Sequence, residues 1–248
     1  MCDVTSSVHY FRALRITFRA NLKGEEAMVE LLAAIKENVI CGNSDLNSPI
    51  KKGQPGVVEY VTQALESGLS PQEILNEGLI KGMDVIGKSF KANEIYVPEV
   101  LIAARAMKAG MAILKKPLAD TGVKPIGTFI VGTVKGDLHD IGKNLVAMMM
   151  EGAGFHIIDL AIDVPAEKFI SAMKENPDAI VGMSALLTNT MVGMEGNIKS
   201  FRKAGLKNPV IIGGAPVDEE YARKINADGY AKDAATAVEV AKRILGVK

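Results

Sequence analysis

The stretch PIGTFIVGTVKGDLHDIGKNLVAMMM, residues 125–150, decides the fold. It reads as an apolar run at 126–134, a polar loop and then a helical pattern near 140–153. Nearly continuous apolar strands that alternate with helices are typical of a parallel sheet covered on both faces. We therefore predict a flavodoxin-like, doubly wound, five-stranded parallel sheet in the order 2-1-3-4-5. The alternation continues with apolar runs at 156–161, 179–185, 209–214 and 228–231 and helix candidates near 165–175, 190–204, 217–225 and 234–245.

The part of the chain before this stretch has a different pattern. Apolar residues recur at the spacing of one helical face, which predicts an antiparallel four-helix bundle at 26–116. Ser70-Pro71-Gln72-Glu73 is a capping box with proline at the first helical position, so it marks a helix start clearly. We expect an N-terminal extension at 1–25, a linker at 117–124 (PLADTGVK) and the sheet domain at 125–248.

Charge and composition exclude several classes of protein. The 29 Lys and Arg residues balance the 29 Asp and Glu residues, which speaks against a nucleic-acid or membrane-surface partner. No apolar run reaches the roughly 20 residues of a membrane span, and the N-terminus lacks the apolar core of a secretory signal. The 2 cysteines cannot build a disulfide framework or a Cys-rich metal site, so we expect a cytoplasmic protein without membrane contact.

The predicted strand order places a ligand site at two loops. In this arrangement the winding reverses between strands 1 and 3, and ligands bind beyond their carboxyl ends. The loops that follow these strands are residues 135–142 and 184–190, and both are unusually polar for segments that leave buried strands.

The first of these loops carries a histidine with a carboxylate two residues before it. The loop is not a P-loop, because five residues separate Gly136 from Gly142 and Asn144 stands where a hydroxyl must ligate magnesium. His139 alone reads as an ordinary loop histidine, but with Asp137 on its other nitrogen it would be a good donor to a transition metal. Since the chain offers no second convergent histidine, a metal here would arrive already coordinated, as in a macrocycle.

Lys135 to Asn144, KGDLHDIGKN, resembles the D-x-H-x-x-G cobalamin-binding motif of methionine synthase and of corrinoid methyl-carrier proteins. Ser184-x-Leu186 and Gly213-Gly214 match the other two parts of that signature in order and spacing. The segment 82–111 is similar to the helical cap that precedes the binding domain in this family. The resemblance covers about residues 26 to 246 and implies a cap bundle followed by a B12-binding domain.

The resemblance also implies roles for individual residues. His139 would replace the cofactor's own base beneath cobalt, as the metal ligand, Asp137 would hydrogen-bond it, and Thr190 would stand where the family often completes the relay with a hydroxyl. Phe90 and Val97 match cap positions that shield the methyl group, although helical spacing alone fits plain bundle core equally well. Further cofactor contacts are implied for the motif residues Gly136, Leu138, Asp140, Ile141, Gly142 and Leu186, for Ser184 and Thr188 at the base and tail, and for Gly213 and Gly214, which like Gly142 would let the backbone approach the tail.

The implied function is that of a corrinoid protein, not catalytic by itself, with cobalamin or a related corrinoid as cofactor and the methylated form as intermediate. It would carry a methyl group on cobalt from a substrate-specific methyltransferase to a second one that serves tetrahydrofolate or coenzyme M. A reductive activase would be a further partner.

Two alternatives stay open at this point. The cobalamin-binding subunit of a mutase also carries D-x-H-x-x-G but normally lacks a helical cap, which argues against it. A cobalamin-dependent regulator has a comparable bundle and binding domain after a DNA-reading segment. Residues 1–25 are too short for a helix-turn-helix domain with its own core, and the net charge is neutral.

Overall fold

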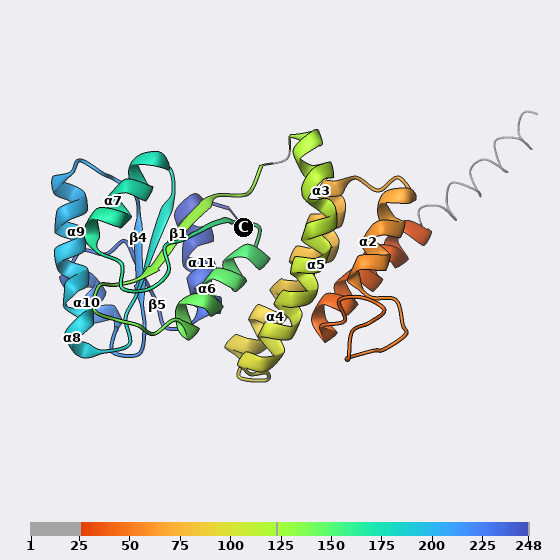
Figure 1. The fold of residues 1–248 in the computed structure, drawn as a ribbon, viewed down its shortest axis with the longest axis horizontal. Coiled ribbons are helices and arrows are strands. Elements are labelled where there is room, and N and C mark those ends of the chain that lie inside the picture. The colour runs from red at the N-terminus through yellow and green to blue at the C-terminus, as the bar shows by residue number, and fades with distance from the viewer. Residues whose placement is uncertain (1–25, 123, 248) are drawn as a thin grey trace, which may run out of the picture.

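The computed structural model describes residues 26–122 and 124–247, in a helical part followed by a part built around a sheet. Figure 1 shows the two parts side by side, with α6 and α11 between the sheet and the helical part. The expected extension at 1–25 lies outside the described residues. Within the described ranges, no helix combines the length and apolar character that crossing a membrane requires.

The helical part is the bundle that the sequence predicts. Ser70 accepts a hydrogen bond from the Glu73 amide and the Glu73 carboxylate accepts one from the Ser70 amide, so the predicted capping box is formed. The stretch that follows is helical throughout but contains a π-helix, a wider turn that the apolar spacing did not reveal. The elements are a helix over 26–41, α2 (Val57–Glu66), α3 (Pro71–Glu73), the π-helix η1 (Ile74–Ile80), α4 (Lys81–Lys91) and α5 (Val97–Thr121).

The predicted linker begins too early. Helix α5 runs through Pro117 to Thr121 and ends at Gly122, which has a φ of 69°. Proline usually breaks a helix because it lacks an amide hydrogen and clashes with the preceding turn. Here Leu114 and Leu118 are buried on one face on either side of the proline, and the packing of that face keeps the last turn helical. The connection to the sheet is therefore shorter than the predicted segment.

The sheet follows the predicted order. It has five parallel strands in the order β2-β1-β3-β4-β5. Helices α6 and α11 cover one face, and α7 and α9 cover the other (Figure 1). The strands are β1 (Thr128–Thr133), β2 (His156–Asp159), β3 (Ile180–Ser184), β4 (Val210–Gly213) and β5 (Gly229–Ala231), and the helices are α6 (Ile141–Gly152), α7 (Ala166–Glu175), α8 (Thr188–Met191), α9 (Gly193–Lys203), α10 (Glu219–Lys224) and α11 (Ala234–Leu245).

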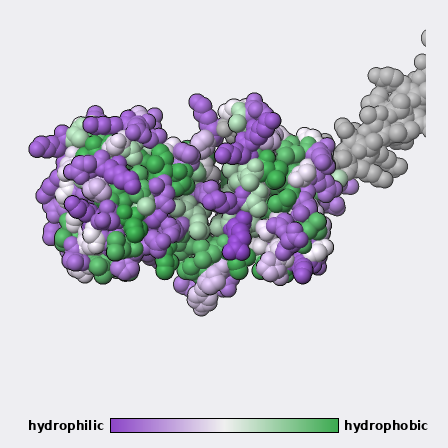
Figure 2. Space-filling view, viewed as in Figure 1, coloured by the Kyte–Doolittle hydropathy of each residue, from purple (hydrophilic) through white to green (hydrophobic). Residues whose placement is uncertain are grey.

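The bundle packs on the α6 and α11 side of the sheet. One hydrophobic core runs from the bundle through these two helices to the sheet face beneath them. Two ion pairs also join α4 to α11, Lys91 with Glu239 at 2.6 Å and Asp84 with Lys242 at 3.6 Å. Figure 2 shows hydrophobic surface reaching across the zone between the two parts. This docking brings the end of α4, and with it Phe90, to the carboxyl edge of the sheet.

Candidate cofactor-binding site

The site is built where the winding of the sheet reverses, as the strand order predicts. The loop after β1 and the loop after β3 leave neighbouring strands, whose ends pair Thr133 with Ser184. Residues 135–140 turn away from the sheet before α6 begins at Ile141, and Gly136 takes a φ of 84° in this turn. That conformation is costly for any residue with a Cβ, which explains the glycine.

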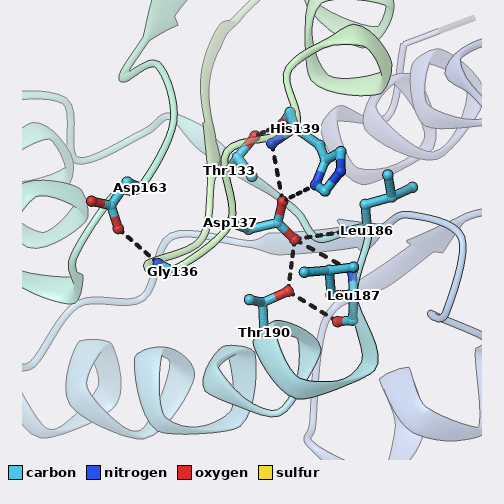
Figure 3. Close-up of polar contacts among 8 residues, drawn as sticks. All are labelled: Thr133, Gly136, Asp137, His139, Asp163, Leu186, Leu187 and Thr190. Carbon is cyan, nitrogen blue, oxygen red and sulfur yellow. Dashed lines mark hydrogen bonds and ion pairs between the residues drawn. The ribbon is translucent and has the colours of Figure 1, made fainter.

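Asp137 lies buried at the centre of the site and joins the two loops (Figure 3). Its Oδ1 accepts hydrogen bonds from the His139 amide at 3.1 Å and pairs with His139 Nδ1 at 2.7 Å. Its Oδ2 accepts from the Thr190 hydroxyl at 2.6 Å and from the Leu186 amide at 2.8 Å. The carboxylate therefore links the loop after β1 to the loop after β3, and it acts as the acceptor in each of these hydrogen bonds.

These contacts set the charge of Asp137. Burial on its own raises the pKa of a carboxyl group, because it disfavours the charged form. The hydrogen bonds from Thr190, Leu186 and His139 outweigh burial here, and they hold the pKa of Asp137 well below its usual range. Asp137 is thus a fixed negative charge beneath the His139 ring.

The Asp137 contact also fixes the direction of the His139 ring. Because Nδ1 faces the carboxylate, Nε2 points to the opposite side, and the side chain is 49% exposed. A histidine whose Nδ1 donates to a carboxylate presents Nε2 as a lone-pair donor, which is the tautomer that metal ligation needs. The described residues contain no group of three or more His, Cys, Asp or Glu side chains that could hold an ion by itself. A metal at Nε2 would have to come with most of its ligands already in place.

A cavity of about 590 Å³ opens beside His139. It runs from the carboxyl edge of the sheet inward between the strands and α6 and α11. Phe129 is paired with Ile180, four residues before the edge pair of Thr133 and Ser184, so the cavity reaches roughly 13 Å along the strands. Polar side chains stand near its mouth, while its inner wall is apolar and contains Phe129, Val131, Leu145, Gly182, Met183, Ile211, Ile212 and Ala237.

The surroundings of His139 fit a macrocycle with an apolar rim and a tail. Leu138 and Ile141 are 69% and 74% exposed beside the ring, and Leu186 is 44% exposed across the second loop. Apolar side chains gathered at such exposure around one polar atom mark a binding surface. A Cβ built on Gly142 would meet nothing within 4 Å, so this part of the wall is open space. The donor atom, the apolar surface around it and the deep slot together suit a corrinoid.

Most of the predicted site residues meet at this cavity, but not all. Asp137 and Thr190 lie behind the wall and support His139. Thr188 is exposed at the start of α8, Val97 packs against the bundle core, and Gly136 lies in the turn after β1, so the structure brings none of the three to the wall. The predicted residues in the wall are Phe90, Leu138, His139, Asp140, Ile141, Gly142, Ser184, Leu186, Gly213 and Gly214.

Gly213 and Gly214 were predicted to be glycines because the backbone approaches the cofactor tail, and this reason is incomplete. A Cβ on Gly213 would stand 2.6 Å from the Ala231 carbonyl oxygen, and one on Gly214 would stand 1.8 Å from that of Ala185. Both glycines are therefore required by the close approach of the protein's own backbone, whatever binds in the cavity. Of the three glycines predicted to approach the tail, Gly142 alone faces open space.

The different surroundings of Gly214 and Gly142 predict different effects for two variants, one on stability and one on the cavity. Gly214→Ala is expected to lower the free energy of unfolding by at least about 2 kcal/mol, because Gly214 has a φ of 128° and no room for a Cβ. Gly142→Ala lies in a helix with free space, so its stability should be unchanged or higher by up to about 1 kcal/mol, because alanine favours a helix over glycine, while its methyl group enters the cavity. Urea unfolding of the two apo variants measures the contrast, and equal losses would contradict it.

Three further residues shape the site and were not predicted. Thr133 is buried, and its hydroxyl donates to the His139 carbonyl oxygen at 2.8 Å. Asp163 accepts from the Gly136 amide at 2.7 Å. Lys143 is buried in the cavity wall with its ammonium group 2.6 Å from Asp159. The glycine-lysine pair that draws attention to Lys143 is visible in the sequence, but its partner on β2 follows only from strand pairing, and nothing in the sequence marks Asp163.

Comparison with known proteins gives a consistent answer. The B12 binding domain family matches residues 127–239, and a second family described as B12 binding domain matches residues 54–115. A corrinoid protein of Desulfitobacterium hafniense (strain Y51) is 37% identical over 224 residues, which are 88% of this chain and 99% of that protein. Dimethylamine corrinoid protein 2 of Methanosarcina acetivorans is 39% identical over 215 residues, which are 86% and 98%.

Solved structures agree. The methanol:cobalamin methyltransferase complex MtaBC from Methanosarcina barkeri matches with a TM-score of 0.74 and 28% identity, over 88% of this chain and 81% of that one. A cobalamin-binding protein from Desulfitobacterium hafniense DCB-2 matches with a TM-score of 0.67 and 30% identity, over 86% and 97%. With its two B12 binding domain matches and its full-length similarity to corrinoid proteins, the chain belongs to the corrinoid protein family.

Proposed function

We propose that this chain carries a methyl group on the cobalt of a bound corrinoid between two methyltransferases, and that His139 Nε2 would hold the cobalt. The observation that carries the proposal is the His139 ring, oriented by buried Asp137 at the mouth of a deep, apolar cavity. When bound, the corrinoid supplies the methyl-transfer chemistry, because cobalt(I) is a strong nucleophile and methylated cobalt is a methyl donor. Leu138, Ile141 and Leu186 would contact the ring, and the cavity would hold the tail.

The protein's own contribution at the metal would be an oriented nitrogen. The negative Asp137 faces Nδ1 and leaves Nε2 free to donate to a metal. The Thr190 hydroxyl and the Leu186 amide donate to Asp137 and keep it charged. His139 and Asp137 therefore act as a pair, in which the carboxylate fixes the direction of the ring that would hold the cobalt.

The helical bundle would act as a cover. Phe90 reaches the cavity from α4, and the polar contacts across the docked surface include the Lys91–Glu239 and Asp84–Lys242 pairs. Partly exposed pairs of this kind are worth at most about 1 kcal/mol each, so they oppose separation only weakly. The short connection between α5 and β1 would serve as the hinge when a methyltransferase approaches.

The partners of this protein are methyltransferases. Relatives named for dimethylamine and trimethylamine, together with the methanol complex, support a methylamine or methanol as the first methyl donor. A corrinoid:tetrahydrofolate or coenzyme M methyltransferase would take the methyl group, and a reductive activase would restore cobalt(I). The helical bundle at 26–121 does not favour a mutase subunit, and the corrinoid protein relatives do not favour a regulator.

A labelling experiment tests the function. The purified protein is loaded with hydroxocobalamin, reduced, and mixed with the methyltransferase that co-purifies with it and with 13C-methyl donors, one at a time. The expected result is that one donor transfers its label to the corrinoid bound to this chain, detected by mass spectrometry. A protein that retains no corrinoid, or a partner that labels free cobalamin equally well, would contradict the proposal.

The apolar inner wall predicts which corrinoid binds best. The described residues of the inner wall offer no side-chain nitrogen or oxygen, and the backbone of β3 is paired with strands on both sides. A buried polar group without a partner costs about 1–3 kcal/mol, so a corrinoid with an adenine lower base should bind at least about fivefold more weakly than cobalamin, whose base is dimethylbenzimidazole. Equilibrium dialysis measures both affinities. Ala237→Ser, which adds a hydroxyl to this wall, should lower the ratio of the affinity for cobalamin to the affinity for the adenine-based corrinoid. Equal affinities for the two corrinoids in the wild type would contradict the prediction.

A further inference from the structure

Asp163 holds the backbone that precedes His139, although it lies on a different loop (Figure 3). Its carboxylate accepts from the Gly136 amide at 2.7 Å, and its own amide donates to the Asp137 carbonyl oxygen at 3.1 Å. One residue of the β2–α7 connection therefore grips both ends of the Gly136–Asp137 segment. On the other side of the loop, the buried Thr133 hydroxyl holds the His139 carbonyl.

The conformation of the β2–α7 connection is unusual. Asp163 has a φ of 54° and Ala161 has a φ of 70°, in the left-handed region that residues with a Cβ rarely adopt. Neither residue is buried, so core packing does not impose this shape. Hydrogen bonds join this connection to the end of β1, from the Thr133 amide to the Ala161 carbonyl and from the Val164 amide to the Thr133 carbonyl. The Asp163 contacts add to them, as do bonds from the Ala161 amide to Asp159 and from the Lys168 ammonium group to the Leu160 carbonyl. Strain of this kind persists where surrounding contacts require it.

We infer that Asp163 is a positioning residue for His139, and that it fixes the place of His139 Nε2 by anchoring Gly136 and Asp137 in the same loop. The inference rests on the proposed ligation of cobalt by His139. Asp163 does not line the cavity and is exposed, so it acts through the loop and not by touching the cofactor. Without its grip, Asp137 and His139 keep their mutual hydrogen bond but the loop that carries them is free to shift.

Three substitutions at one position separate the hydrogen bond from the backbone strain. Asp163→Gly accepts the left-handed conformation but removes the carboxylate, Asp163→Asn keeps an acceptor and tolerates the conformation, and Asp163→Ala loses both. Asp218→Ala is the matched control, because Asp218 is an exposed aspartate of the same domain whose carboxylate also accepts one backbone amide, from Tyr221 at 2.7 Å.

The first readout is the electron paramagnetic resonance spectrum of the cobalt(II) form, in which a bound nitrogen splits the cobalt lines. Asp163→Gly and Asp163→Ala should lower the ratio of nitrogen-ligated to unligated corrinoid by about tenfold, which is the effect of losing one hydrogen bond to a charged group. Asp163→Asn and Asp218→Ala should keep the wild-type ratio. The second readout needs no cofactor: in the apo Asp163→Gly protein the Gly136 amide, which loses its acceptor, should exchange hydrogen faster, while the amides of β4 do not change.

The outcomes are distinguishable. A split wild-type spectrum that Asp163→Gly leaves unchanged overturns the positioning role and leaves the proposed function intact. Equal loss in Asp218→Ala also overturns it, because the effect would then be general destabilisation. A wild-type spectrum without nitrogen splitting overturns His139 ligation, and with it the role of Asp163.

Discussion

Replacing His139 by alanine is expected to abolish the nitrogen ligand of the bound corrinoid and to leave the fold intact. The side chain is 49% exposed, so its removal creates no cavity, and Asp137 keeps the amide of residue 139 and the Thr190 and Leu186 donors. Apo stability should therefore stay within about 1 kcal/mol of the wild type. Corrinoid affinity should fall by about 10- to 100-fold, as it does when a metal site loses a supporting contact, or by more.

The control for this variant is His156→Ala. His156 is an exposed histidine of β2 in the same domain, so its removal matches the change in composition without touching the site. Absorption and paramagnetic resonance spectra of both loaded variants measure the ligand, and dialysis measures retention. If His139→Ala shows the same spectrum and the same retention as His156→Ala, axial ligation by His139 is wrong.

The sheet could be predicted because each strand is marked by a run of apolar residues. A strand buried on both faces needs apolar residues throughout, so runs such as 126–134 and 179–185 stand out beside the helical spacing around them. The switch point follows from strand order, and it located the loops of His139 and Thr190 before any contact was known. Only the strand ends differ, since β1 is Thr128–Thr133.

The features that the sequence did not predict share a physical cause. Each depends on contacts between segments that are distant in the sequence. Pro117 signals a helix end locally, but the burial of Leu118 against the bundle overrides it. Gly214 is needed because the Ala185 carbonyl lies against it, which no local pattern records. The grip of Asp163 on Gly136 joins residues 27 apart in sequence, on loops that meet only once β1 and β2 pair.

The Asp137→Asn substitution should have the second large effect, on stability and its dependence on pH. Both carboxylate oxygens accept, one from His139 and the other from Thr190 and Leu186, so an amide nitrogen at either position faces donors. Leaving buried donors unpaired costs about 1–3 kcal/mol each, and we expect a loss of roughly 3 kcal/mol in the free energy of unfolding at pH 7. Urea unfolding of the apo protein measures it.

The pH dependence of the free energy of unfolding tests the charge of Asp137 independently. Because the pKa of Asp137 is lowered in the folded protein, the unfolded chain binds the proton first as pH falls. The stabilisation by the charged carboxylate is thus full above the unfolded pKa of about 3.9 and is lost progressively as the pH drops toward the lower folded value. The Asn variant lacks this term, so the stability gap between it and the wild type should shrink below about pH 5.

Asp178→Asn supplies the comparison, since Asp178 is an exposed aspartate of the same domain and its change should move stability by less than about 0.5 kcal/mol at pH 7. The measurements at low pH are decisive, because a merely steric effect of the amide would lower stability by the same amount at every pH. A gap between wild type and Asp137→Asn that stays constant from pH 7 to pH 3 would mean that Asp137 is not held as a charge by the folded protein. The orientation of His139 Nε2 would then need another cause, because only a charged Asp137 fixes Nδ1 as the donor and leaves Nε2 free to bind metal.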